Sequence, residues 1–247
     1  MLPEERKQII CNYINENQSA TTLELMELCH SSEATIRRDL TDLNKSGLIS
    51  KVHGGAIAIQ NKITSDYMVS ERTEKNQNEK QVLARYAAEL INDNDLVFID
   101  AGTTTVYIID YVTAKNVTFV TNAITHAMKI TQKGYPVYLT GGFLKASTEA
   151  LVGTNCYEDL LRYHFSIGFF GTNGVTHAEG FTTPDPEEAK IKECALSRTH
   201  SPYILCDHSK FRASAPISFA GYNQACIITT GIIPESYKKD STLILIE

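Results

Sequence analysis

Beyond residue 95, short runs of apolar residues alternate with segments whose apolar residues recur at helical spacing. The runs are 96–99, 117–120, 137–139, 165–170, 203–206, 225–228 and 243–246. An unbroken apolar run is typical of a strand that is buried on both faces, and strands that alternate with helices form parallel sheets. The sequence therefore predicts an α/β domain whose parallel sheet is covered on both faces.

The first 57 residues follow a different pattern, in which helical periodicity gives way to a short ribbon. One helix is predicted at the start. A second follows the capping-box pair Thr21 and Glu24. A third follows the N-cap Ser32 and carries apolar residues at i, i+4 and i+7 from Ile36. A short strand over 48–53 and two glycines complete the order, which matches a winged helix-turn-helix.

The stretch 58–78 is polar and weakly periodic, so we expect a linker there. This divides the chain into a domain over 1–57 and a second domain over 79–247. Apolar residues make up 43% and charged residues 21% of the 247 residues, which is ordinary for folded globular proteins. Each domain is therefore expected to fold around a core of its own.

The sequence gives no support for a membrane segment, a metal site or a cofactor. No apolar run approaches the length of a membrane span and the first residues do not form a signal peptide, so we expect a cytoplasmic protein without a membrane partner. The six cysteines show no C-x-x-C spacing, so we expect reduced core thiols and no metal site. We expect no cofactor either.

The third helix presents cations on the face opposite its apolar residues. Helical spacing places Arg38 near the centre of this outward face, with Thr35 and Arg37 on its flanks. In a helix-turn-helix such a face enters the major groove of DNA, where an arginine pairs with guanine. A solvated face balanced by Asp39 and Asp42 is the alternative, since residues 1–60 hold six Lys and Arg against eight Asp and Glu, a net charge of −2. Periodicity does not decide between the two.

The end of the first strand in the second domain has the composition of a phosphate cradle. The strand runs into Asp100 and then Gly102, Thr103, Thr104 and Thr105, and we expect a helix to start just after them. Glycine lets the backbone approach a ligand, hydroxyls donate hydrogen bonds, and a helix N-terminus favours anions. A threonine cluster that only caps a helix is the alternative.

Small and polar residues also follow the other predicted strands. They include 121–122, 140–142, 171–174 and 207–210. Because the carboxyl ends of parallel strands meet at one edge of a sheet, we expect a ligand crevice there. Lys210 either neutralises a phosphate in this crevice or pairs with Asp207 to fix a turn, and the sequence leaves both open.

Motifs in the first domain resemble those of the DeoR family of bacterial transcriptional regulators. They are T-I-R-R-D-L within 32–40 and V-H-G-G-A at 52–56. The resemblance implies that residues 1–57 bind double-stranded operator DNA. The candidate DNA-binding residues are Ser32, Thr35, Arg37, Arg38, Lys51 and His53.

The second domain resembles the sugar-phosphate-sensing domain of the same family. The matching pieces include N-E-K at 78–80, G-F-T-T at 180–183, Glu188 and Lys192. They imply a fold related to ribose-5-phosphate isomerase and a phosphorylated sugar as effector. The candidate effector-binding residues are Asp100, Gly102, Thr103, Thr104, Thr105, Asn122, Gly141, Gly142, Asn173, Asp207 and Lys210. Thr230 stands where the family commonly has aspartate, so we assign it no role.

Other pieces of the second domain resemble fructose-operon repressors. They lie at 173–175, 180–185 and 207–211. Fructose 1-phosphate is therefore the first candidate effector. The leading hypothesis is a homo-oligomeric repressor that a sugar phosphate releases from its operator.

Two rival hypotheses remain. One is a sugar-phosphate isomerase with a fused DNA-binding head. The loop at 171–174 has no carboxylate to act as a base for such an enzyme, although Asp100 and Glu188 remain as possible bases. The other is a phosphate-binding scaffold without regulation, which leaves Arg37 and Arg38 without a role.

Overall fold

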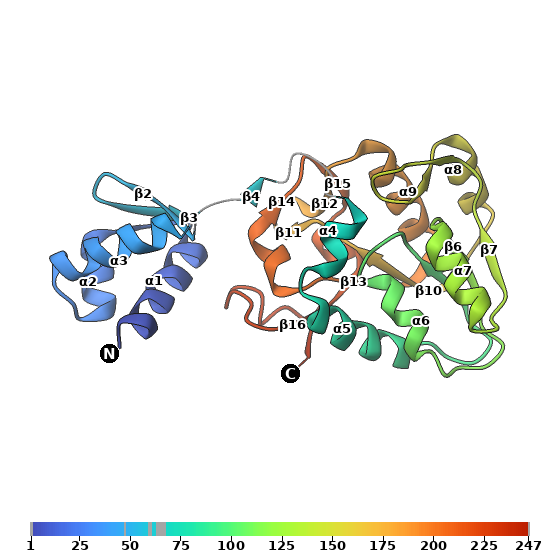
Figure 1. Ribbon diagram of the computed structural model, residues 1–247, viewed down its shortest axis with the longest axis horizontal. Helices are drawn as coiled ribbons and strands as arrows, with labels where there is room; N and C mark the ends of the chain where they lie inside the picture. Colours follow the sequence, from blue (N-terminus) through green and yellow to red (C-terminus); the bar gives the residue numbers. More distant parts are fainter. Residues whose placement is uncertain (1, 47, 59–60, 63–67, 247) are drawn as a thin grey trace. The chain divides into compact units, whose positions relative to one another are not determined.

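A computed structural model describes residues 2–46, 48–58, 61–62 and 68–246 (Figure 1). The chain divides into two compact units. The first comprises Met1–Asn61 with Pro234–Lys239, and the second comprises Lys62–Ile233 with Asp240–Glu247. Within the described ranges, every helix is too short or too polar to cross a membrane.

The first unit is a winged helix-turn-helix, as the sequence predicts. Its helices are α1 (Pro3–Asn17), α2 (Thr22–Cys29) and α3 (Glu33–Lys45). Its strands are β1 (Ser19–Thr21), β2 (Ile49–Val52) and β3 (Gly55–Ala58), which form an antiparallel sheet in the order β1-β3-β2. The β2–β3 hairpin follows α3 and forms the wing. A two-residue strand, β4 (Asn61–Lys62), follows the hairpin.

Short-range hydrogen bonds set the helix boundaries in this unit. The Thr21 hydroxyl accepts from the Glu24 amide at 3.2 Å, and the Thr21 amide donates to the Glu24 carboxylate at 2.7 Å. These two bonds form the predicted capping box. His30 closes α2 with φ of 46°, and the Ser32 hydroxyl caps α3 by accepting from the Thr35 amide at 3.4 Å. The turn between α2 and α3 is therefore three residues long.

The core of the first unit lies where the three helices and the wing meet. Its most deeply buried side chains include Ile10, Ile14, Leu25, Ile36 and Leu40. Because the apolar residues of α3 face this core, the opposite face of α3 is left to solvent.

The second unit is built on a seven-stranded parallel sheet in the order β17-β16-β13-β10-β5-β6-β7 (Figure 1). The strands are β5 (Leu96–Ile99), β6 (Thr118–Thr121), β7 (Val137–Leu139), β10 (Phe165–Gly171), β13 (Thr199–Leu205), β16 (Cys226–Thr230) and β17 (Leu243–Ile246). Each of the seven apolar runs overlaps one of these strands. The predicted fold class is therefore confirmed.

Helices cover the sheet. They are α4 (Val69–Glu74), α5 (Gln77–Glu89), α6 (Ile108–Tyr111), α7 (Ile124–Gln132), α8 (Thr154–Leu161) and α9 (Pro186–Ser197). On β5, Val97 and Ile99 face a cluster that includes α5 and α6. Phe98 faces the other way and packs against Phe165 and Phe170, at 5.2 and 5.4 Å between ring centroids. This alternation is what a strand buried on both faces requires.

Smaller elements flank the large sheet. They are the hairpin of β8 (Phe143–Leu144) and β9 (Leu151–Val152), the antiparallel sheet of β11 (Gly174–Thr176), β12 (Gly180–Thr183) and β15 (Ile217–Ala220), and the short strand β14 (Ala213–Ser214). The 3-10 turns are Thr105–Tyr107, His208–Arg212 and Tyr222–Gln224.

The stretch 58–78, for which the sequence predicts a linker, contains α4 and the start of α5. Residues 59–60 and 63–67 lie outside the described part. At the start of α4, the Val69 amide donates to the Ser147 carbonyl at 3.1 Å and so fastens this helix to the second unit. The six residues of α4 include a single aliphatic side chain, which explains why the sequence shows no helical periodicity here.

Candidate functional site

Two acidic residues of α3, Asp39 and Asp42, pair with α1 rather than with the arginines near them in sequence. The buried Asp39 carboxylate accepts from the Arg6 Nε at 2.6 Å, and the Asp42 carboxylate lies 3.0 Å from the Lys7 Nζ. The hydrogen bond and charge of Lys7 lower the pKa of Asp42. Both carboxylates thus join α3 to α1, which argues against the alternative of a face balanced by its own acids.

Arg37 and Arg38 are exposed on the outward face of α3. Arg37 pairs with Glu33 one turn earlier, at 2.6 Å between its guanidinium and the carboxylate. Arg38 forms no ion pair within the part of the chain that the structure describes. An exposed pair such as Arg37–Glu33 stabilises a helix little, so its guanidinium can exchange this partner for a phosphate.

The wing adds a cation next to α3. The Lys51 Nζ donates to the Thr41 hydroxyl at 2.7 Å, which brings β2 against the outward face of α3. His53 is exposed at the turn between β2 and β3. At the start of α3, the hydroxyl of the N-cap Ser32 lies 2.9 Å from the Thr35 hydroxyl. The predicted DNA-binding residues therefore lie on α3, at its N-cap and on the adjoining wing.

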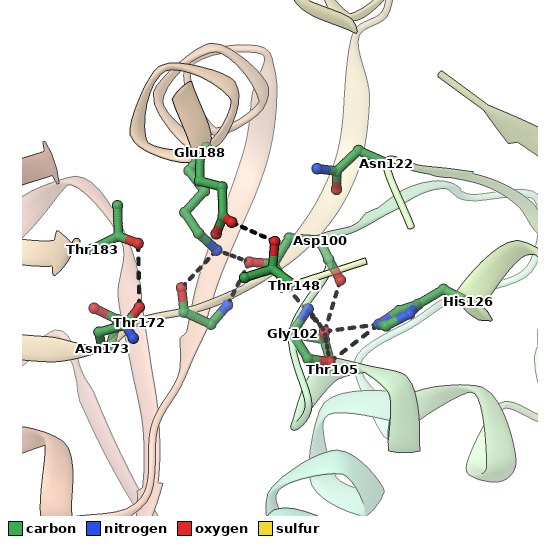
Figure 2. A network of polar contacts seen from close by, with 12 residues as sticks. Asp100, Gly102, Thr105, Asn122, His126, Thr148, Thr172, Asn173, Thr183 and Glu188 are labelled. Carbon is green, nitrogen blue, oxygen red and sulfur yellow. Dashed lines mark hydrogen bonds and ion pairs between the residues drawn. The ribbon is translucent and has the colours of Figure 1, made fainter. Parts of the chain in front are cut away.

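Asp100 is the centre of a polar network at the carboxyl end of β5 (Figure 2). It is 2% exposed, accepts from the Gly171 amide at 2.8 Å and forms an ion pair with the Lys192 Nζ from α9. Lys192 also donates to the Gly171 carbonyl at 3.1 Å. The ends of β5 and β10 are thus tied together, which agrees with the expected meeting of strand ends at one edge.

Hydrogen bonds, and not a long helix, fix the loop after Asp100. A 3-10 turn and the four residues of α6 replace the expected helix, so its dipole contributes little. The Thr105 hydroxyl lies 2.9 Å from the Asp100 carbonyl and 3.0 Å from the Asp100 carboxylate, and it accepts from the Gly102 amide at 3.1 Å. Thr105 therefore supports the loop, and its hydroxyl is already engaged.

His126 on α7 supports the same loop from the other side (Figure 2). Its Nε2 lies 3.2 Å from the Gly102 carbonyl, which can only accept, so this nitrogen carries the proton. Its Nδ1 then accepts from the Thr125 hydroxyl at 3.4 Å. Burial lowers the pKa of His126 to about 4, against the opposing charge of Asp100. The ring is therefore neutral at physiological pH.

Glu188 on α9 belongs to a second cluster of ion pairs. Its carboxylate accepts from the Thr148 hydroxyl at 2.6 Å and from the Lys145 Nζ at 2.9 Å. Lys145 also lies 2.8 Å from the carboxylate of Asp185, which caps α9. Asp100 and Glu188, the two possible bases of an isomerase, are thus each paired with a lysine.

Four cations lie near one another: Arg72 on α4, Lys75 just after it, Lys80 on α5 and Lys210 in the turn after β13, and Lys80 contacts the Asp100–Thr105 loop. The Lys80 Nζ donates to the Thr103 hydroxyl at 3.1 Å and to the Arg72 carbonyl. Burial is the main cause that lowers the pKa of Lys80 to about 8; the charges of Lys210, Arg72 and Lys75 lower it further, whereas the charge of Asp207 raises it. Such mutual repulsion marks a site that an anion would stabilise.

The side chain of Arg72 strengthens this interpretation. Its Nε and one terminal nitrogen are buried and have no hydrogen-bond partner among the residues described. Buried guanidinium donors are nearly always paired, and carboxylates and phosphates are their best acceptors. We call Arg72, Lys75, Lys80 and Lys210 the cation cluster.

The Asp207 carboxylate fixes a turn through Ser209 and not through the side chain of Lys210, whose backbone amide donates to the Asp207 carbonyl at 3.1 Å. The carboxylate accepts from the Ser209 amide at 3.0 Å and from the Asn76 side chain at 2.9 Å. No ion pair joins it to Lys210 among the described residues. Burial raises the pKa of Asp207, but the charge of Lys210 and these hydrogen bonds outweigh burial and lower it overall. Lys210 therefore keeps its donors for another anion.

Glu79, Asp207 and His208 place ligand atoms within 4.8 Å of one another, a spacing that would suit a metal ion. However, the His208 Nδ1 already lies 2.9 Å from the Glu79 carboxylate. The positive charges of Lys80 and Lys210 beside Asp207 oppose a further cation. We assign no metal to these residues.

Two asparagines from the predicted site are held by neighbouring strands. The Asn122 side-chain amide donates to the Leu151 carbonyl at 3.1 Å, and Figure 2 shows its oxygen pointing toward the Asp100 network. The Asn173 side chain accepts from the Thr183 hydroxyl at 3.2 Å. Asn122 therefore faces the site, whereas the oxygen of Asn173 is engaged in the β11–β12 sheet.

The described contacts of the two glycines after β7 lead away from the Asp100 network. The Gly141 amide donates to the Asp159 carboxylate of α8 at 2.8 Å. Gly142 has φ of 129°, and a Cβ there would lie 2.5 Å from the Val152 carbonyl. Glycine is therefore required at Gly142, where the chain after β7 passes close to β9, and the Gly141 amide links the same loop to α8. Thr230 is also structural, because its hydroxyl donates to a backbone carbonyl of β17 at 2.9 Å.

Several site residues were absent from the predicted set; besides Lys75 and Lys80 of the cation cluster, they include Arg72, Lys145 and Lys192. Arg72 lies in the unpredicted α4, and Lys145 lies in the β8–β9 hairpin. Lys192 appeared only as part of the family resemblance. Each pairs with or faces residues distant in sequence, as Lys192 does with Asp100 over 92 positions. The N-E-K motif just after Arg72 was the nearest sequence signal for this part of the site.

Comparison with known families gives two matches. The DeoR-like helix-turn-helix domain matches residues 6–62, and the DeoR C terminal sensor domain matches residues 75–231. Together they span both units.

Curated relatives match over nearly the whole chain. The HTH-type transcriptional regulator FruR of Bacillus subtilis (strain 168) is 39% identical over 231 residues, which cover 93% of this chain and 92% of the relative. IolR of the same organism is 34% identical over 235 residues, covering 94% and 93%. The lactose phosphotransferase system repressor of Staphylococcus aureus (strain N315) is 33% identical over 226 residues, covering 89% and 88%.

Solved structures give distant likenesses. A D-ribose-5-phosphate isomerase in complex with phospho-erythronic acid has a TM-score of 0.42 and 13% identity, over 54% of this chain and 53% of the other. The probable sor operon regulator from Shigella flexneri has a TM-score of 0.43 and 12% identity, over 66% and 88%. Likenesses this distant say nothing about activity. On the two family matches and the length over which the relatives align, the chain belongs to the DeoR family of transcriptional regulators.

Proposed function

We propose that the protein represses a sugar-utilisation operon and that a phosphorylated sugar releases it from operator DNA. In this proposal α3 and the wing bind the operator, and the second unit binds the effector in the cytoplasm. Fructose 1-phosphate is the first candidate, because one relative is named FruR and the sequence resembles fructose-operon repressors. The name of another relative, a lactose phosphotransferase system repressor, supports repression.

The cation cluster carries the sensor half of the proposal. Buried Arg72 nitrogens without an acceptor, next to Lys80 and Lys210, favour a ligand with a compact negative charge. The Thr104 hydroxyl, in the loop beside them, has no hydrogen-bond partner among the described residues and can donate to the same ligand. A phosphate supplies enough acceptor oxygens for all these donors.

The outward face of α3 supports the DNA-binding half. Asp39 and Asp42 are paired with α1, which leaves Arg38 exposed and Arg37 in a weak surface pair. A single small domain binds DNA modestly, so we propose a homo-oligomer whose heads occupy paired half-sites. Sedimentation of the purified protein, with and without operator, measures the number of subunits.

We further propose that the protein is not an enzyme. Lysine pairing of Asp100 and Glu188, and the absence of a carboxylate at 171–174, disfavour the isomerase alternative. Incubation with aldose and ketose phosphates is expected to give no interconversion above buffer. Turnover that disappears in Glu188→Gln would instead favour the isomerase.

A titration of operator complexes tests the whole proposal. Genomic fragments selected by the purified protein supply the operator, and a labelled operator then reports binding by fluorescence anisotropy. Fructose 1-phosphate, fructose 6-phosphate, other hexose phosphates and inorganic phosphate are added in turn. We expect fructose 1-phosphate to weaken the complex most. If no sugar phosphate changes the affinity for DNA, the sensor half of the proposal is wrong.

A further inference from the structure

The carboxamide of Asn122 has a fixed orientation. This residue directly follows β6, and its Nδ2 donates to the Leu151 carbonyl at 3.1 Å while the Leu151 amide donates to the Asn122 carbonyl at 2.7 Å. A rotated carboxamide would place two carbonyl oxygens face to face, because the Leu151 oxygen can only accept. The side-chain oxygen of Asn122 must therefore face away from β9.

That oxygen is a buried acceptor without a donor. Asn122 is 5% exposed, and its Oδ1 is among the few buried side-chain atoms with no hydrogen-bond partner in the described residues. Buried acceptors are seldom left unpaired in folded proteins. Figure 2 shows this oxygen directed toward the side of the site where Asp100 and Thr148 lie.

The Asn122 Oδ1 lies beside the Asp100–Thr105 loop, and this loop leads to the cation cluster. In the β5–β6 ladder Thr121 pairs with Ile99, so the next residues, Asn122 and Asp100, leave the sheet side by side. The chain then continues to Thr103, which accepts from Lys80 in the cation cluster. The loop is thus flanked by an acceptor at β6 and by cationic donors at α4 and α5.

We infer that the effector binds in one direction, with its phosphate at the cation cluster and one sugar hydroxyl donating to the Asn122 Oδ1. This inference rests on the proposed function. A hydroxyl satisfies the acceptor, whereas a methylene leaves it unpaired and a carboxylate repels it. The ligand class is therefore a polyhydroxylated sugar monophosphate that carries no charge besides its phosphate, rather than the phosphate of a deoxy sugar or of a sugar acid.

Calorimetric titration of three variants separates the two ends of the site. Asn122→Leu is expected to weaken binding of fructose 1-phosphate, or of whichever hexose phosphate binds the parent best, by about tenfold and to leave inorganic phosphate unchanged. Arg72→Met is expected to weaken both ligands. Thr229→Val, which alters another buried unpaired side chain of the same sheet, is the matched control and is expected to weaken neither.

Monodeoxy analogues of the same sugar phosphate test the parent protein without a mutation at Asn122. We expect one analogue to lose about tenfold in affinity, and we expect Asn122→Leu to bind that analogue and the full sugar phosphate alike. The inference would be overturned if the analogue bound more weakly than the full sugar phosphate by the same factor in the parent and in Asn122→Leu. It would also be overturned if Asn122→Leu bound the sugar phosphate as tightly as the parent does. If no sugar phosphate binds the parent, the proposed function itself fails.

Discussion

Arg38 is exposed and unpaired among the described residues, because the two acids near it in sequence pair with α1. Asp39 and Asp42 flank it in sequence, but one binds Arg6 and the other binds Lys7. Charge counting along a sequence treats all of these residues as equivalent. The structure separates charges that hold the fold together from charges that are presented to a partner.

Substitution of the α3 arginines should weaken operator binding. We expect Arg38→Ala to cost about 1–3 kcal/mol if the guanidinium reads a base, and Arg37→Ala to weaken binding as well because its pair with Glu33 is exposed. Lys51→Ala should reduce affinity for all sequences alike. Anisotropy titrations with operator and with scrambled DNA measure each effect. Parental affinity in both arginine variants would rule out this face.

Two adjacent threonines should differ in what they contribute. Thr105→Val removes a hydroxyl that is bonded to Asp100 and Gly102, so we expect the free energy of unfolding to fall by about 1–3 kcal/mol. Thr104→Val removes a hydroxyl without such bonds and should weaken only effector binding. Chemical denaturation and ligand titration of both variants test the contrast. An equal loss of stability in the two variants would contradict it.

At the level of elements, the seven strands of the large sheet and the three helices of the winged unit could be predicted because their signals are local. Apolar runs and capping pairs lie within one element. The short α4 and the pairing of Lys192 with Asp100 have no local signal, since they depend on elements that meet only in the folded chain. For the same reason the sequence did not show that a 3-10 turn and the four residues of α6 would replace the helix expected after Thr105.

The packing of α7 against the β5 loop should make stability depend on pH. The pKa of His126 is about 4 when folded and about 6.5 when unfolded, so the unfolded chain binds the extra proton between these values. Stability should then fall as pH drops from 6.5 toward 4, by up to about 1.4 kcal/mol per pH unit. His126→Gln should flatten this slope in denaturation experiments. A variant as steep as the parent would exclude His126 as the source.

For the whole molecule, sensing and DNA binding should be separable by mutation. Lys210→Met removes one charge of the cation cluster, so we expect normal operator binding that sugar phosphate no longer releases. Arg38→Ala should bind sugar phosphate like the parent and fail on DNA. Linkage requires that operator weaken effector binding by the same factor as effector weakens operator binding. Loss of both activities in Lys210→Met would show that this residue supports folding instead.

The pKa of about 8 at Lys80 has a consequence for the energetics of induction. Near pH 8 about half of the molecules hold this amine neutral, and a bound phosphate raises its pKa, so effector binding takes up protons from solution. The heat of binding should then vary with the ionisation enthalpy of the buffer, as between Tris and HEPES, and Lys80→Arg should remove this variation. In the proposed function, alkaline conditions would weaken the binding of the effector and leave the repressor bound to its operator.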